Sequence, residues 1–170
     1  MSKIVSTGKS LAVGLIALAL LLSQSACGYR LAGTAELPPD LQSLQLLTSG
    51  FSEAQRRSLS RSLTSAGAKL VEDPDAEATR LNVSLAAPQD QRLVTSGSSG
   101  AIVMRISRGL TFDLKAADGT VIAPVQTLRQ QRDVSLDDDN LLSSEQERDN
   151  AVLQLEQQLY QQLIRQLTRI

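Results

Sequence analysis

The sequence lacks histidine and tryptophan altogether and has one cysteine among its 170 residues. Without histidine, the usual general base, the Ser-His and Cys-His nucleophile pairs and the commonest transition-metal ligand are missing. A lone cysteine excludes an internal disulfide. Only two Tyr and two Phe are present, so aromatic platforms for stacking on bases are scarce. These absences predict a protein that is not an enzyme and that has neither a metal nor a cofactor.

Charge excludes a further class of function. The chain has 17 basic and 18 acidic residues, a formal net charge of −1, whereas a nucleic-acid-binding surface needs a clear excess of positive charge. Residues 1–26 contain two of the basic residues, Lys3 and Lys9, and the remainder has a net charge of −3. Nearly all the remaining basic residues are Arg, whose forked guanidinium suits phosphate and carboxylate, although a GC-rich genome gives the same bias.

One long apolar run is present, at residues 11–22. Twelve residues rise about 18 Å as a helix, which is too short for the hydrocarbon core of about 30 Å. Because Lys3 and Lys9 precede this run, it has the proportions of a secretory signal. We therefore expect residues 1–26 to be a signal peptide.

Small residues, Ser25 and Ala26, stand directly before the lone Cys27. This arrangement resembles the lipobox of bacterial lipoproteins, although Gln24 stands where an apolar residue is usual. The resemblance implies cleavage before Cys27, a diacylglycerol on its thiol and an acyl group on its amine. Two or more acyl chains attach a protein firmly to a membrane, and Gly28, which is not Asp, implies the outer membrane. The alternative is an ordinary signal peptide cut near Ala26 that leaves a free thiol.

The rest of the chain predicts one α+β domain at residues 41–170, after a tether at residues 27–40 that ends in two prolines. A short apolar segment at residues 41–47 predicts the first strand. Ser52 and Gln55 then form a capping-box pattern, and Gly67 stands where a helix C′ residue belongs. The first helix is expected between them, with an apolar face at Leu59, Leu63 and Ala66.

Alternating apolar residues predict three strands that form an antiparallel meander. They lie at residues 81–85, 102–114 and 121–134, and only Arg108 breaks the apolar set of the middle strand. The Asp118-Gly119 pair predicts the hairpin turn, and Pro124 predicts an edge strand. A second capping box at Ser144 predicts the start of a long amphipathic helix. The predicted fold is therefore a two-layer α+β sandwich, with a mostly antiparallel four-stranded sheet packed against two helices.

The opening Cys27-Gly-Tyr-Arg-Leu-Ala-Gly33, followed by proline, resembles the lipopolysaccharide-assembly lipoprotein family LptE. The order of predicted elements is similar too, although Ala32 stands where family members often have Arg. The resemblance implies a lipid-anchored protein on the periplasmic side of the outer membrane. It further implies a complex with the β-barrel LptD, whose lumen the protein would plug. In that complex the protein would help to assemble the barrel and to pass lipopolysaccharide to the outer leaflet.

In the LptE family, basic residues near one strand loop and near the last helix are implicated in lipopolysaccharide binding. Here the corresponding loop at residues 96–100 contains only Ser and Gly, so the family residues do not carry over. Four arginines are candidates by their chemistry alone: Arg92, Arg105, Arg129 and Arg132. The alternative interpretation is that they are ordinary surface charges of a sheet.

Two other functions remain open. One is an outer-membrane lipoprotein that serves a different barrel-assembly or lipid-transport complex. The other is an envelope hydrolase that uses acidic pairs such as Asp133 with Asp137, but nothing in the sequence predicts the cleft that opposed carboxylates need. The acidic run at residues 137–139 lacks the alternating ligands and the glycine of a calcium loop, so a solvated connector is expected there.

Overall fold

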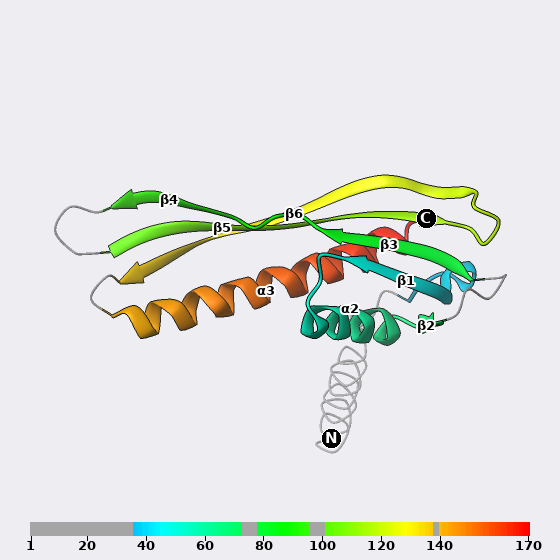
Figure 1. The fold of residues 1–170 in the computed structure, drawn as a ribbon, viewed down its shortest axis with the longest axis horizontal. Helices are drawn as coiled ribbons and strands as arrows, with labels where there is room; N and C mark the ends of the chain where they lie inside the picture. The colour runs from blue at the N-terminus through cyan, green and yellow to red at the C-terminus, as the bar shows by residue number, and fades with distance from the viewer. Residues whose placement is uncertain (1–35, 73–77, 96–100, 138–139) are drawn as a thin grey trace, which may run out of the picture. The chain divides into compact units, whose positions relative to one another are not determined.

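The computed structural model describes residues 36–72, 78–95, 101–137 and 140–170. After a 3₁₀ turn at Pro39–Leu41, these ranges contain two helices and six strands (Figure 1). In chain order the elements are β1 (Ser43–Ser49), α2 (Glu53–Ser65), β2 (Lys69–Leu70), β3 (Thr79–Leu85), β4 (Gln89–Thr95), β5 (Ala101–Lys115), β6 (Val121–Asp137) and α3 (Leu141–Leu167). The class is α+β, as predicted.

The sheet is centred on the long strand β5. All of one edge of β5 pairs with β6, whereas the other edge is shared by two strands. Residues 102–107 of β5 pair with β4, and residues 110–115 pair with β3. β3 in turn pairs with β1, and β1 with β2. The prediction of four strands was therefore wrong, since the described part of the sheet has six.

The sheet is also mixed. β1 runs parallel to both β2 and β3, whereas β3, β4 and β6 are all antiparallel to β5. The parallel pairs arise because α2 carries the chain back across the sheet before the next strand begins, as a crossover must. The predicted antiparallel contacts among the segments at residues 81–85, 102–114 and 121–134 are confirmed. The prediction that these three segments follow one another directly along the chain was wrong, because β4 lies between β3 and β5.

β4 has no recognisable apolar pattern in the sequence. Its first four residues, Gln89-Asp-Gln-Arg92, are all polar. It forms a strand because β5 extends beyond the end of β3 and offers it an unpaired edge. The chain reaches this edge through the turn at residues 86–88. The strand conformation of β4 therefore depends on its pairing with β5 rather than on its own sequence.

The capping box of α2 is confirmed. Ser52 Oγ accepts from the Gln55 backbone N–H at 3.3 Å, and Gln55 Oε1 accepts from the Ser52 N–H at 2.9 Å. Leu59, Leu63 and Ala66 are buried as predicted. Gly67 follows with φ +93°, a conformation that favours glycine, so the expected end of the helix is confirmed too.

The predicted start of α3 at Ser144 was wrong. Asn140 is the N-cap, and its side chain accepts from the Ser143 N–H at 3.4 Å. The Ser144 N–H already donates to the Asn140 carbonyl at 3.1 Å, which places Ser144 inside the first turn. The helix is amphipathic as predicted: Leu155, Leu159, Leu163 and Leu167 are buried, whereas Leu153 is exposed.

The hairpin between β5 and β6 forms as expected. The Gly119 N–H donates to the Ala116 carbonyl at 2.9 Å, and Asp118 Oδ1 accepts from the Thr120 N–H at 2.8 Å. Among the described strands β6 pairs with β5 alone, so the prediction that Pro124 lies on an edge strand is confirmed.

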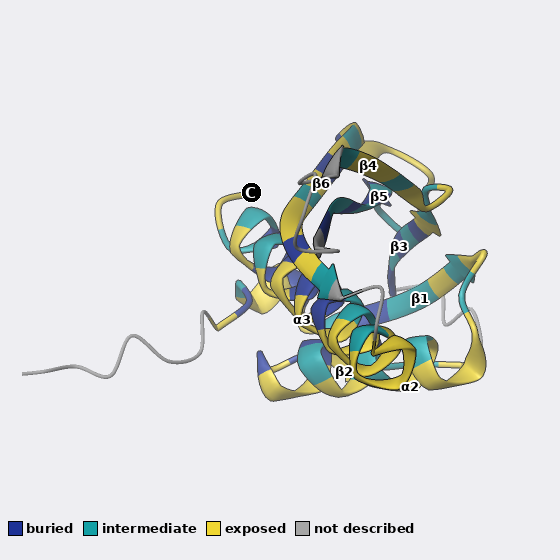
Figure 2. Cartoon of the chain, turned by 90° about the vertical axis from the view of Figure 1, so that its left-hand side faces the viewer, coloured by how far each residue is buried: buried dark blue, intermediate teal, exposed yellow. Residues whose placement is uncertain are grey.

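Both helices cover the same face of the sheet (Figure 1). Viewed end-on, the sheet is curled, and α2 and α3 lie together (Figure 2). A large apolar cluster joins both helices to β1, β3 and the second half of β5. A small one, centred on Ile106, Val134, Ala151 and Leu155, lies beneath the first half of α3. One end of the domain therefore has a large apolar core and the other end a small one. We call the end with the small core the arm. It consists of β4, the first half of β5, the second half of β6 and the first half of α3.

Candidate functional site

Strand register separates the four candidate arginines into two pairs. Arg105 lies opposite Asp133, and Gly109 lies opposite Arg129, so Arg105 and Arg129 share one face of the hairpin. That face points away from α3, because the alternate residues, Ile106 and Val134, pack beneath the helix. Arg92 pairs with Met104 and Arg132 with Ile106, which places these two arginines on the helix-covered face. The structure therefore does not bring the four together.

Arg105 is neutralised in place. Its Nε and Nη2 donate to Asp133 Oδ1 and Oδ2 at 2.7 and 2.8 Å. These bonds lower the pKa of Asp133 and raise that of Arg105. A carboxylate held by both oxygens is poorly placed for acid–base chemistry, and the side chain of Asp137, its suggested catalytic partner, lies outside the described residues.

The other three candidate arginines differ in whether their side chains are hydrogen-bonded. Arg132 donates from Nη1 to Gln154 Oε1 on α3. Arg92 and Arg129 are exposed, and neither forms a hydrogen bond or an ion pair with another described residue. Of the four, Arg92 and Arg129 are therefore the two most available for an external anion.

The helix-free face of the sheet is polar over all the long strands. Here Asn82 Nδ2 donates to Asp113 Oδ2 at 2.8 Å across β3 and β5. Neighbouring positions on this face also have mostly short neutral side chains: Gln45, Ser84, Ser107, Thr111, Thr127, Gln131 and Ser135. This open face therefore offers many neutral hydrogen-bonding groups, and among the described residues its basic ones (Arg80, Arg105, Lys115 and Arg129) outnumber its acidic ones (Asp113 and Asp133).

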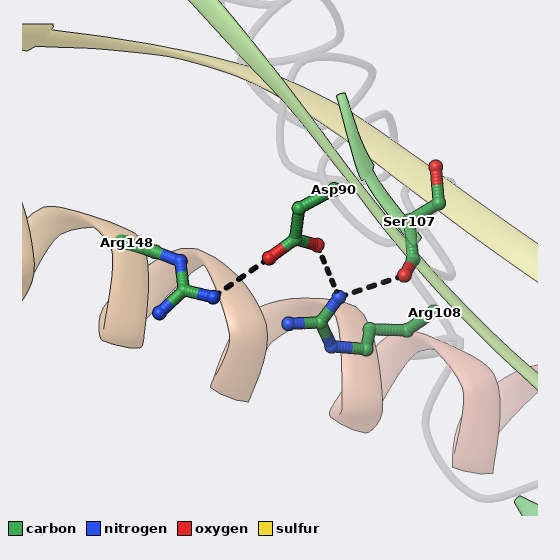
Figure 3. Close-up of polar contacts among 4 residues, drawn as sticks. All are labelled: Asp90, Ser107, Arg108 and Arg148. Atoms are coloured by element: carbon green, nitrogen blue, oxygen red, sulfur yellow. Dashed lines mark hydrogen bonds and ion pairs between the residues drawn. The ribbon is translucent and has the colours of Figure 1, made fainter. Parts of the chain in front are cut away.

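The sequence did not reveal a second polar cluster, between β4, β5 and α3 (Figure 3). Arg108 Nη1 donates to Asp90 Oδ1 at 2.6 Å and to the Ser107 carbonyl at 2.8 Å. Arg148 Nη2 donates to Asp90 Oδ2 at 2.7 Å. Burial of Asp90 works against its ionisation, but the bonds from both arginines outweigh that effect, so the pKa of Asp90 lies below its ordinary value. The one available signal was Arg108, the polar residue in an otherwise apolar set.

A cavity of about 240 Å³ lies beside this cluster, where β5 changes neighbours from β4 to β3. Its polar lining comes from Gln55, Arg108, Glu156 and Tyr160. The remaining lining residues are small or apolar: Gly50, Leu85, Ala86, Ala87, Pro88, Gly109 and Leu159. The sequence predicted neither the cavity nor its polar residues, because they come from four separate segments.

Several predicted features lie outside the described residues: the signal peptide, Cys27 and most of its tether, the loop at residues 96–100, and residues 138–139 of the acidic run. Neither of the two helices in the described ranges combines the length and the apolar character of a membrane-spanning segment.

Two helices on one face of a curled mixed sheet define the structural class, and solved structures share it. A minor lipoprotein from Acinetobacter baumannii matches with TM-score 0.57 and 19% identity over 76% of this chain and 94% of that one. An uncharacterized lipoprotein B from Nitrosomonas europaea matches with TM-score 0.59 and 21% identity over 83% and 90%. The rare lipoprotein B from Shewanella oneidensis matches with TM-score 0.60 and 14% identity over 75% and 94%. At these identities the likeness shows a shared fold.

No protein-family model and no curated protein matches the sequence.

Proposed function

We propose that this protein is a bacterial lipoprotein of the outer membrane, attached on the periplasmic side through acyl groups on Cys27. Two independent observations support the proposal. The lone Cys27 follows Ser25 and Ala26 at the end of a signal-like run. The described domain shares its fold with three proteins that are named lipoproteins. The agreement between the lipobox-like sequence and this fold carries the proposal.

Within the envelope, we propose that the domain acts in lipopolysaccharide transport as a plug and assembly partner of the barrel LptD. The LptE-like opening at residues 27–33 supports this role. The open sheet face supports this role as well. The lumen of a large outer-membrane barrel is polar, so a plug inside it contacts polar side chains of the barrel wall rather than lipid. Neutral side chains such as Thr127 and Gln131 can exchange hydrogen bonds with such a wall without burying charge.

A contact with the phosphates of lipopolysaccharide would use the free arginines. Arg129 lies on the open face and has no acidic partner among the described residues, whereas Arg105 on the same face is held by Asp133. Arg92 is equally free but lies on the other face of the sheet. We therefore assign Arg129 as the primary phosphate contact on the open face and Arg105 as a secondary one.

Labelling with radioactive palmitate tests the anchor. The wild-type protein should incorporate label and run as the processed form, whereas Cys27→Ala should remain an unlabelled precursor in the membrane fraction. Ser10→Ala, which changes a residue ahead of the apolar run, is the control and should be processed normally. Normal cleavage of the Cys27→Ala protein would show that an ordinary signal peptide is present.

Affinity purification from detergent-solubilised outer membranes tests the partner. A tag at the C-terminus should recover LptD as the dominant protein, and depletion of the lipoprotein should lower lipopolysaccharide on the cell surface. Recovery of a different barrel or transport complex, with unchanged surface lipopolysaccharide, would instead assign the protein to that complex. An acyl-free, solitary protein would overturn both assignments.

A further inference from the structure

Glu156 is a buried carboxylate without a cationic partner among the described residues. It lies in the middle of α3 and is 9% exposed. Its Oε1 accepts from Gln55 Nε2 at 2.5 Å, and no described side chain forms an ion pair with it. Buried carboxylates are normally paired, because the charged form loses its hydration. The second oxygen, Oε2, therefore lacks a counter-charge.

The capping box fixes Gln55 in this arrangement. Its Oε1 already accepts from the Ser52 N–H, so its Nε2 must point away from the start of α2, toward Glu156. Gln55 can therefore serve one carboxylate oxygen but supplies no positive charge.

Tyr160 brings an unsatisfied hydroxyl to the same place. It follows Glu156 by four residues, so the two side chains lie on one face of α3. Tyr160 is 1% exposed, and its hydroxyl has no hydrogen-bond partner among the described residues. Burial and the neighbouring Glu156 both raise the pKa of the phenol. Tyr160 therefore remains protonated and presents an oxygen that both accepts and donates.

Both groups line the cavity described above, which has room for more than one water molecule. Its walls are aliphatic at Leu85, Ala87 and Leu159. Arg108 also lines it, but its Nη1 is committed to Asp90 and Ser107. The cavity therefore joins apolar walls to a negative group, an unpaired hydroxyl and a guanidinium that is already ion-paired with Asp90.

We propose that this cavity binds a primary ammonium group carried on an aliphatic stem. The ammonium donates to Oε2 of Glu156 and to the hydroxyl oxygen of Tyr160, and the stem lies along Leu85, Ala87 and Leu159. An anion would meet Glu156 unfavourably, and a neutral alcohol would supply only one donor. The same chemistry is found in a free alkylamine and in the lysine side chain of a partner protein. The site is separate from the proposed anchor and from the open sheet face.

Titration with n-butylammonium tests the site, on ¹⁵N-labelled full-length protein in detergent micelles. The amide signals of Ala86, Ala87 and Gly109 should shift with saturable, millimolar affinity. Butan-1-ol has the same stem without the charge and should bind at least about tenfold more weakly, since hydrogen bonds to charged groups are the stronger ones. Unmoved signals at these three residues, or equal binding of the alcohol, would overturn the proposal.

Two variants locate the binding groups. Glu156→Gln should reduce butylammonium affinity by about tenfold or more, whereas Glu147→Gln, at an exposed position of the same helix, should leave it unchanged. Tyr160→Phe keeps the ring and should reduce affinity severalfold even if Glu156→Gln fails to fold. Unchanged affinity in Tyr160→Phe together with unchanged affinity in folded Glu156→Gln would overturn the assignment.

A second probe identifies the source of the amine. N-acetyl-lysine methylamide presents the same ammonium on a peptide backbone. If it binds as well as butylammonium, the cavity accepts a partner's lysine. If only butylammonium binds, the cavity accepts a free amine. Failure of both probes would reject the site while leaving the anchor and the LptD assignment untouched.

Discussion

Arg105 of β5 lies directly opposite Asp133 of β6, and two nearly parallel hydrogen bonds of 2.7 and 2.8 Å join the guanidinium to the carboxylate. Such forked pairing uses the geometry that would otherwise recognise a phosphate. Arg129 lies four residues before Asp133, about 13 Å along the strand, without a partner of this kind among the described residues. Of the two candidate arginines on the open face, Arg129 is therefore unpaired and Arg105 is paired with Asp133.

Asp133→Asn should release Arg105 and strengthen binding of lipopolysaccharide to the open face. One freed guanidinium is worth about 1 kcal/mol, or roughly fivefold in affinity. Equilibrium binding of labelled lipopolysaccharide to the purified protein measures the gain. The gain should disappear when Arg105→Gln is added to Asp133→Asn, and its persistence there would show that Arg105 makes no contact.

Arg129→Glu should weaken the same binding more than Arg105→Glu does, because only Arg129 is free before lipid arrives. We expect about a tenfold loss for Arg129→Glu, since the change removes an attraction and adds a repulsion. Arg61→Glu, on the exposed side of α2, is the matched control for a change of two charge units. Equal losses for Arg61→Glu and Arg129→Glu would mean that net charge alone governs binding.

The half-buried ion cluster of Asp90, Arg108 and Arg148 predicts how stability depends on pH. The pKa of Asp90 is lowered in the folded protein, so its contribution is complete above the unfolded pKa near 4 and disappears as pH falls through the folded value. Asp90→Asn should cost about 1–3 kcal/mol at pH 7 and should flatten the loss of stability below about pH 4. Urea unfolding at several pH values measures both effects. Parallel pH profiles for the two proteins would contradict the role of Asp90.

Much of the local structure was predictable because its signals are short-range. Ser52 with Gln55, Gly67 and the turn at Asp118-Gly119 each act within a few residues, and all three form as expected. The alternation over residues 102–114 also placed the buried face of β5 correctly, with Arg108 as its one polar member. That exception marked the ion cluster, although its partners Asp90 and Arg148 gave no signal.

The features that the sequence did not predict depend on contacts between residues far apart in the chain. β4 is polar and is a strand only because β5 extends past β3, and the parallel pairing of β1 with β3 depends on the path through α2. The side of the sheet on which each arginine lies depends on strand register. A shift of one residue in register would move a side chain to the other side, and the composition of the strand does not indicate the register. The cavity gathers Gln55, Glu156 and Tyr160 from two helices, and neither helix predicts it alone.

The arm has a small core, so a truncation there should loosen it locally. Leu155 is buried in the cluster with Ile106 and Val134, and Leu155→Ala should cost about 2–5 kcal/mol. Hydrogen exchange should show faster exchange in β4 and the first half of β5 than in β3, because the larger cluster remains intact. Leu153→Ala, at an exposed position of α3, should change neither quantity. A uniform rise in exchange would show that the two clusters unfold as one unit.

Gly109 marks the point where β5 passes from β4 to β3, and a side chain there should disturb both neighbours. A Cβ at this position would lie 3.1 Å from the Leu128 carbonyl oxygen and 3.4 Å from Ala86 Cβ. Neither can retreat freely, since Leu128 is paired with Leu110 and the Ala86 N–H donates to the Gly109 carbonyl at 2.9 Å. Gly109→Ala should therefore cost about 1–3 kcal/mol in the free energy of unfolding.

Chemical denaturation of Gly109→Ala measures that cost, and Ser107→Ala, two residues earlier on the same face of β5, is the matched control. Adding Ala86→Gly to Gly109→Ala removes one of three close contacts, the others being the Leu128 oxygen and Arg129 Cγ. It should recover only part of the loss, because the Leu128 oxygen still lies too near. Full recovery of stability in the double variant would mean that β6 can move away from the new Cβ at this point. Only the turn after β3 would then be rigid. Since Ala86 and Gly109 also line the cavity, the same variants should weaken butylammonium binding if its wall moves with the strand.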